Sequence, residues 1–171
     1  MLMFTDNMEI KVEGNKIIVT GDLGSVEKEF NPRLVKIEIK NGQPEVIPLV
    51  KNKRKAKMLK NTYLRLIEQM KIGVTKGYEQ LMEVVYSHFP VTLEVKGDKL
   101  IIKNLYGERI PREAKIVGKT KVEVKGKTLR VYGIDKYEVF QTVANIMQAC
   151  KQNKFDPRVF QDGIYPVEGA L

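Results

Sequence analysis

Apolar and polar residues alternate in short runs along this chain, which is the pattern of half-buried β-strands. Between residues 8 and 20 the alternation is interrupted at Gly14-Asn15, a pair that suits a two-residue hairpin turn with a positive φ at its first position. Gly97-Asp98 and Gly126-Lys127 interrupt later runs in the same way. The pattern therefore predicts antiparallel strands joined by tight turns.

Two longer stretches, at about residues 53–72 and 136–152, have apolar residues at helical spacing instead. The expected core positions are Ala56, Leu59, Tyr63, Leu66, Ile67 and Met70 in the first helix, and Val139, Phe140, Val143, Ala144, Met147 and Cys150 in the second. Asp135 followed by Glu138 predicts a capping box where the second helix begins. We expect each helix to cover the apolar face of the strands before it.

These patterns occur twice because the sequence contains an internal duplication. Residues 10–27 align with residues 93–110 at a shift of 83, with glycines and apolar residues in register, and residues 37–42 align with residues 122–127. A repeat of this length indicates two copies of one supersecondary unit. The predicted fold is α+β, a tandem duplication of a small domain in which one helix covers an antiparallel sheet.

The boundary between the copies is expected near Gly73 and Gly77, two glycines that should end the first helix and permit a turn. We place the N-terminal domain at residues 1–74 and the C-terminal domain at residues 75–171. The segment after residue 150 contains prolines and glycines and is expected to be an ordered but irregular tail.

The charge balance narrows the possible partners. The chain has 30 Lys and Arg against 21 Asp and Glu, a net charge of +9 and a sequence pI of about 9.5. Such an excess favours polyanions, and nucleic acid first, because neutralising phosphates releases condensed counterions. The alternative is a basic or heat-adapted protein whose lysines and glutamates form surface ion pairs.

Evidence for an enzyme is weak. The chain has one histidine and one cysteine, and it has no CxxC, HExxH, Walker-type or GxGxxG motif. His88 is expected to be packed or hydrogen-bonded, Cys150 to pack in the core, and Asp156 and Asp162 to form ordinary turns. Because no run is long enough to span a membrane and no signal peptide is apparent, we expect a soluble, intracellular protein without cofactor, metal or membrane contact.

Basic residues gather in both halves. Residues 51–60, KNKRKAKMLK, hold six Lys or Arg and no acid, and they open the first predicted helix. This run is either a solvated helix face or a polyanion contact. The second half has a cluster made of Arg109, Arg112, Lys115, Lys119 and Lys121. Some of these residues are expected only to line exposed strand edges, where lysine opposes aggregation.

The tail mixes cations with aromatic rings. Lys151, Lys154 and Arg158 alternate with Phe155, Phe160 and Tyr165. Cations can pair with phosphates while flat rings stack on bases or riboses, so the mixture is typical of RNA contact. In the alternative interpretation, Phe160 and Tyr165 pin the tail to the domain.

Three blocks connect the chain to a known family. GVTKGYEQLMEVVYSHFPV at 73–91, GIDKYEVFQTVANI at 133–146 and DPRVFQDGIY at 156–165 together resemble the universal large-subunit ribosomal protein six, in its archaeal and eukaryotic form, and the resemblance covers about residues 8–168. It implies a structural protein that binds large-subunit ribosomal RNA mainly through its C-terminal domain. It also implies a place near the sarcin-ricin loop and the stalk base, beside other ribosomal proteins, where translational GTPases dock.

The resemblance and the basic clusters together give a candidate RNA-binding set. The family's tail motif falls on residues 158–165, and its inter-domain motif falls on residues 73–77. The predicted RNA-binding residues are Thr75, Lys76, Arg109, Arg112, Lys115, Lys119, Lys121, Lys151, Lys154, Arg158, Phe160 and Tyr165. The runner-up is a free-standing RNA-binding or RNA-remodelling protein. An RNA-modifying enzyme would need a cofactor or metal site that the sequence does not show.

Overall fold

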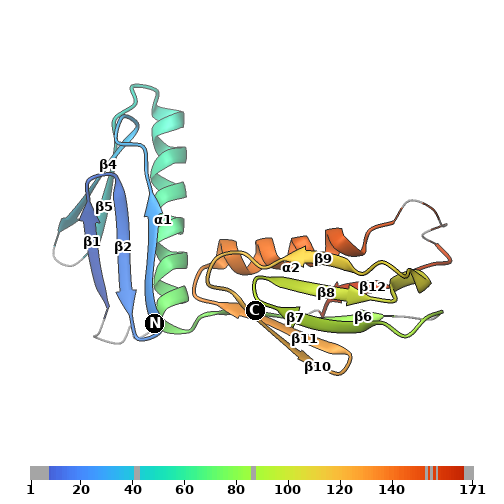
Figure 1. Ribbon diagram of the computed structural model, residues 1–171. Helices are drawn as coiled ribbons and strands as arrows, with labels where there is room; N and C mark the ends of the chain where they lie inside the picture. Colours follow the sequence, from blue (N-terminus) through green and yellow to red (C-terminus); the bar gives the residue numbers. More distant parts are fainter. Residues whose placement is uncertain are drawn as a thin grey trace. The chain divides into compact units, whose positions relative to one another are not determined.

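A computed structural model describes residues 8–40, 43–85, 88–152, 154, 156 and 158–167. The chain divides into two compact units, and the division falls between Gly77 and Tyr78. Figure 1 shows the N-terminal unit in blue to green and the C-terminal unit in green to red. None of the helices within the described residues is long and apolar enough to cross a membrane.

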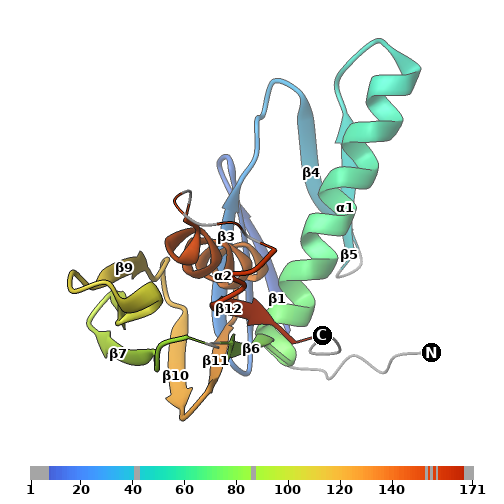
Figure 2. The same cartoon turned by 90° about the vertical axis from the view of Figure 1, so that its right-hand side faces the viewer.

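The N-terminal unit consists of strands covered by one long helix. Strands β1 (Glu9–Glu13), β2 (Lys16–Gly21) and β3 (Gly24–Glu29) form an antiparallel sheet in that order, and β4 (Val35–Lys40) pairs with β5 (Gln43–Pro48). Helix α1 (Lys53–Thr75) packs against both groups of strands, and Figures 1 and 2 show the strands on one side of it. The core between them includes Ile17, Val19, Val26, Val35, Val46, Ile67, Met70 and Val74.

The C-terminal unit repeats this plan and extends it. Strands β7 (Thr92–Lys96), β8 (Lys99–Lys103) and β9 (Arg112–Lys115) form a three-stranded sheet, and the 3-10 turn η1 (Leu105–Gly107) precedes β9. A four-stranded sheet has the order β10 (Lys121–Lys125), β11 (Thr128–Gly133), β6 (Tyr78–Val85) and β12 (Gly163–Pro166). Helix α2 (Lys136–Cys150) packs on β9, β11, β6 and β12. Strands β6 and β12 have no counterpart among the described residues of the N-terminal unit.

The predicted duplication is confirmed down to single hydrogen bonds. The carbonyl oxygen of Asn15 accepts from the amide of Phe30 at 2.8 Å, and that of Asp98 accepts from Ile116 at 2.8 Å. Both pairs tie the first hairpin turn to the end of the third strand. The helices also begin alike, since Asn52 caps α1 and Asp135, 83 residues later, caps α2. The main departure from the prediction is that the described strands of each unit form two sheets instead of one.

The predicted hairpin turns are confirmed. Gly14, Gly97 and Gly126 have φ values of +60°, +57° and +61°, and each follows the last residue of one strand and stands two residues before the next. The residues after them have negative φ, which defines a type II′ turn. Glycine is needed at the first turn position because a Cβ there disfavours the left-handed region.

Helix boundaries and faces differ from the prediction in three places. Gly73 lies buried inside α1, so only Gly77, with φ of +76° and its amide bonded to Ile72 and Gly73, ends the helix. In α2, Ala144 and Met147 are exposed and do not join the core. Thr142 and Ile146, which were not among the expected core residues, are buried instead.

The tail is also more regular than predicted. Residues 163–166 form β12, which pairs antiparallel with β6 from Gly163 opposite Val85 to Pro166 opposite Met82. The side chain of Ile164 is buried in the core of the unit. A proline is tolerated at the end of β12 because β12 is an edge strand.

Candidate nucleic-acid interface

Arg112 on β9 fastens the carboxyl end of α2. Its Nη1 donates to the carbonyl oxygens of Ala149 at 3.0 Å and Lys151 at 2.8 Å. Its Nε and Nη2 donate to the Glu108 carboxylate at 2.7 and 2.8 Å, which lowers the pKa of Glu108 and raises the pKa of Arg112. The guanidinium also lies 5.5 Å from the centroid of the Tyr106 ring. These contacts occupy the guanidinium within the protein, so the geometry favours a structural role over phosphate binding.

A second set of contacts pins the tail beyond α2. Tyr106 adopts a positive φ of +54°, uncommon for a residue with a Cβ, and its hydroxyl donates to the carbonyl oxygen of Asp162 at 2.6 Å. The buried Asp162 carboxylate lies 3.1 Å from Nδ1 of His88. The His88 ring in turn stacks on Phe160, with centroids 4.5 Å apart and 27° between the planes. His88 is thus hydrogen-bonded and packed as predicted, and Phe160 acts as an anchor.

A groove of about 750 Å³ lies between α2 and this anchored tail. Its walls include Ala144, Met147 and Cys150 from α2 and Phe160, Ile164 and Tyr165 from the tail. The exposed residues of α2 are therefore part of a groove. Tyr165 is 44% exposed, and its hydroxyl donates to the carbonyl oxygen of Gln161 at 3.0 Å. Burial raises the pKa of Cys150 to about 11, so this thiol stays protonated and unreactive at neutral pH.

Three of the predicted cations lie along the tail. Lys151, at the carboxyl end of α2, is exposed and lines the groove. Lys154 is exposed and close enough to Glu108 to contribute to the lowered pKa of that carboxyl. The Arg158 side chain is 89% exposed and pairs with Asp156, with both of its hydrogen bonds at 3.1 Å. Phe155, one of the aromatic residues that alternate with these cations in the sequence, lies outside the described residues.

The other predicted cations of the C-terminal unit lie on different surfaces. Lys115 stands opposite Lys99 in the register of β8 and β9, where both side chains are exposed. Lys121 stands opposite Tyr132 in the register of β10 and β11. Arg109 is exposed in the connection between η1 and β9. Because Lys115 and Lys121 lie on edge strands, the strand-guarding interpretation also fits them.

Lys119 is presented by a loop that α2 holds in place. The carboxylate of Glu138 accepts from the Lys119 amide at 3.0 Å, and the hydroxyl of Thr142 accepts from the Val117 amide at 3.0 Å. The predicted capping box is therefore confirmed at Asp135 and wrong at Glu138. Asp135 caps α2 by accepting from the Tyr137 amide at 2.9 Å, whereas Glu138 reaches to this loop and fixes it.

Two predicted residues belong to the end of α1. The Thr75 hydroxyl donates to the carbonyl oxygens of Lys71 at 2.9 Å and Ile72 at 3.2 Å, which uses its proton within the helix. Lys76 is the exposed C-cap residue. Sequence reasoning missed Tyr106, because the Asp162 carbonyl that its hydroxyl contacts lies 56 residues away in the chain. It also missed Glu108, which holds Arg112 against the end of α2.

These features define a class: a two-domain scaffold made by tandem duplication, with a groove in its second domain that is lined by aromatic rings and Lys151. No group of three or more metal-ligating side chains that could hold an ion occurs in the part of the chain that the structure describes. The sequence model of the family described as ribosomal protein L6 matches residues 4–77 and 89–163, one match for each copy. The chain belongs to this family, which confirms the resemblance seen in the sequence blocks.

Curated relatives agree with the assignment. The large ribosomal subunit protein uL6 of Methanosarcina mazei is 39% identical over 165 residues, covering 96% of this chain and 93% of the relative. The protein of the same name from Picrophilus torridus is 39% identical over 179 residues, covering 100% and 99%. That of Ignicoccus hospitalis is 40% identical over 164 residues, covering 94% and 88%. The family is one of ribosomal structural proteins, so the chain is not an enzyme.

Proposed function

We propose that the chain binds large-subunit ribosomal RNA through the tail of its C-terminal unit, near the sarcin-ricin loop and the stalk base. There it would contact neighbouring ribosomal proteins and support the docking of translational GTPases. Membership of the L6 family makes it a cytoplasmic protein of the large ribosomal subunit. The observation that supports the tail as the contact is the groove that Lys151, Phe160 and Tyr165 share.

The anchored tail gives each residue a distinct role. Lys151, Lys154 and Arg158 would contact phosphates and supply most of the affinity, while the shape of the folded RNA selects the site. The half-exposed Tyr165 ring offers a surface for a base or ribose. Arg112 and Phe160 act indirectly by fixing the segment that carries these residues. Arg109, Lys115, Lys119, Lys121 and Lys76 remain predicted phosphate contacts.

A filter-binding experiment with matched variants tests this proposal. The test variant combines Lys151→Gln, Lys154→Gln and Arg158→Gln, and the probe is a ribosomal RNA fragment that contains the sarcin-ricin region. Three lost phosphate contacts should lower the log–log salt slope by about 2 to 3, at about 0.7 to 0.9 per contact. The control combines Lys96→Gln, Lys99→Gln and Lys103→Gln, three lysines of the same unit that are paired with glutamates.

The control removes the same net charge from the same unit. If only the test variant loses affinity and slope, the tail carries the contact. Equal losses in both variants would mean that binding follows net charge alone, and wild-type affinity in the test variant would place the contact elsewhere. Either of these results would overturn the proposed role of the tail.

A further inference from the structure

We infer that the outer face of α1 in the N-terminal unit is a second RNA-binding surface, which contacts the sugar-phosphate backbone. This outer face consists of Arg54, Lys57, Asn61 and Arg65. The inference rests on the proposed function, because it assumes that the same RNA also meets the C-terminal unit. It extends that function to a unit for which the resemblance implied no main RNA contact.

The charged residues in the first three turns of α1, and in the segment just before it, are all positive. From residue 46 to residue 67 the chain has seven cations and no Asp or Glu. They are Lys51, Lys53, Arg54, Lys55, Lys57, Lys60 and Arg65. Each of these residues is exposed. The net charge of this 22-residue segment is +7, and the net charge of the whole chain is +9. The segment therefore accounts for most of the net positive charge.

Helical geometry aligns three of these cations opposite the core. At about 100° per residue, Arg54, Lys57 and Arg65 fall on the side of α1 opposite the buried Ile67, Met70 and Val74. Arg54 and Arg65 are separated by about 16 Å along the axis, at about 1.5 Å per residue. In Figure 1 the strands of this unit lie on the other side of α1, and none of the described elements of the unit covers this face.

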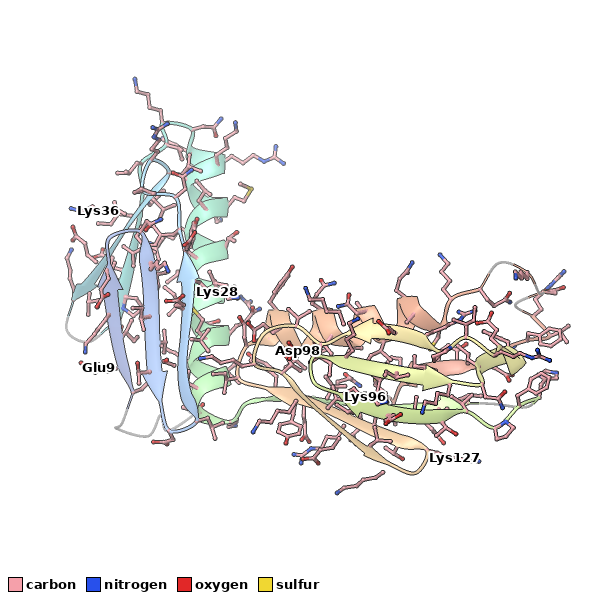
Figure 3. The ribbon with its side chains drawn as sticks, in the orientation of Figure 1. Glu9, Lys28, Lys36, Lys96, Asp98 and Lys127 are labelled. Atoms are coloured by element: carbon pink, nitrogen blue, oxygen red, sulfur yellow. The ribbon has the colours of Figure 1, made fainter. Side chains whose placement is uncertain are left out.

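Ion pairing separates this face from the other lysines of the unit. On the strands, lysines are paired with glutamates: Lys11 with Glu9, Lys36 with Glu38 and Lys40 with Glu45. Figure 3 labels Lys36 on β4 among the side chains that project from the strands. The cations of the outer face have no ion pair with any residue that the structure describes. Surface ion pairing of a heat-adapted protein therefore explains the strand lysines and leaves the α1 cations unexplained.

The neighbouring polar side chains favour RNA over an acidic protein. A shallow groove of about 440 Å³ runs beside Arg65 and is lined by Asn61, Thr62, Leu66 and Gln69. The side-chain amide of Asn61 both donates and accepts, which suits phosphates together with ribose hydroxyls, whereas carboxylates only accept. The Thr62 hydroxyl already donates to the carbonyl oxygen of Met58 at 2.9 Å. Lys60 is not included in the proposed surface, because it lines a different hollow that also contains Glu45.

The test uses the full-length protein and a transcript of archaeal large-subunit ribosomal RNA. The outer-face variant combines Arg54→Gln, Lys57→Gln and Arg65→Gln, which keeps good helix formers at exposed positions. The control combines Lys11→Gln, Lys36→Gln and Lys40→Gln, the paired lysines of the same unit. We expect the outer-face variant to weaken binding about tenfold near physiological salt and to lower the salt slope by about 2 to 3. The control should bind like wild type.

Parallel arms separate the possible failures. If the outer-face variant binds like wild type while the tail variant is impaired, the inference is wrong and the proposed function stands. If wild-type binding itself shows no salt dependence, both are wrong. Equal losses in the outer-face variant and its control would reduce the effect to net charge and overturn the inference. If polyglutamate of matched charge displaces the RNA from wild type as well as unlabelled RNA does, the face is a general acidic-protein surface, which also overturns it.

Discussion

Replacing Arg112 with methionine should destabilise the C-terminal unit without removing a phosphate contact. Methionine keeps an apolar stem of similar length but loses all four hydrogen bonds of the guanidinium. The carbonyl oxygens of Ala149 and Lys151 would each lose a donor, at about 1 kcal/mol apiece. The Glu108 pair is worth about 1 kcal/mol, because its carboxylate is 36% exposed and solvent screens it. The expected loss in the free energy of unfolding is about 3 kcal/mol.

Guanidinium chloride unfolding followed by circular dichroism measures this loss. Arg112→Lys should recover little of it, because an ammonium group cannot reproduce the planar fork that joins Glu108 to two carbonyls. Arg109→Met is the matched control, since it removes an exposed cation three residues away and should change stability by less than about 0.5 kcal/mol.

The same variants decide whether Arg112 also contacts RNA. If its role is only structural, Arg112→Met should leave the salt slope of RNA binding unchanged under conditions where it is folded. A phosphate contact would instead lower the slope by about 0.7 to 0.9. The structural reasoning is refuted if Arg112→Met is as stable as wild type and the slope falls.

Two further predictions concern groups that line the same groove. Burial raises the pKa of the Cys150 thiol from 9.0 to about 11. The protonated thiol therefore contributes its full stability below pH 9, and this contribution is lost as the pH rises toward 11. In urea unfolding, wild type should lose about 2 kcal/mol more than Cys150→Ala between pH 8 and 10.5. Equal pH dependence in the two proteins would show that the thiol is not protected. Phe160→Ala should lower the free energy of unfolding by about 2 kcal/mol, less than the loss of a fully buried ring, because the tail loses its stacking contact with His88. The same variant should bind RNA more weakly, and Phe160→Leu should recover most of the stability and most of the binding. A Phe160→Ala variant as stable as wild type would contradict the anchoring role.

Features set by local chemistry were predictable from the sequence. The three turn glycines, the cap at Asp135 and the apolar stripe of α1 all depend on residues within a few positions of one another. The duplication was visible because these local signals recur at one spacing. The core face of α2 was harder to predict, since Thr142 is buried as a hydrogen-bonded hydroxyl, which hydrophobic periodicity does not detect.

Features that depend on distant partners were not predictable. Strand β12 forms because residues Gly163–Pro166 pair with the edge of β6. These four residues include a proline and have little strand propensity of their own, so the sequence alone did not predict the strand. The role of Arg112 depends on carbonyls up to 39 residues away, so a composition rule could only class it with the other cations. The groove likewise requires α2 and the tail to be placed together first.

The position of β6 has a consequence for folding during synthesis. The β6 segment is made before the rest of the C-terminal unit, yet it pairs on one side with β11 and on the other with β12, whose residues are about 80 positions later. The N-terminal unit has no such delay, because its strands precede the helix that covers them. A nascent chain can therefore complete its first domain while the β6 edge of the second is still unpaired. Until β12 arrives, that edge is open to pairing with another nascent chain.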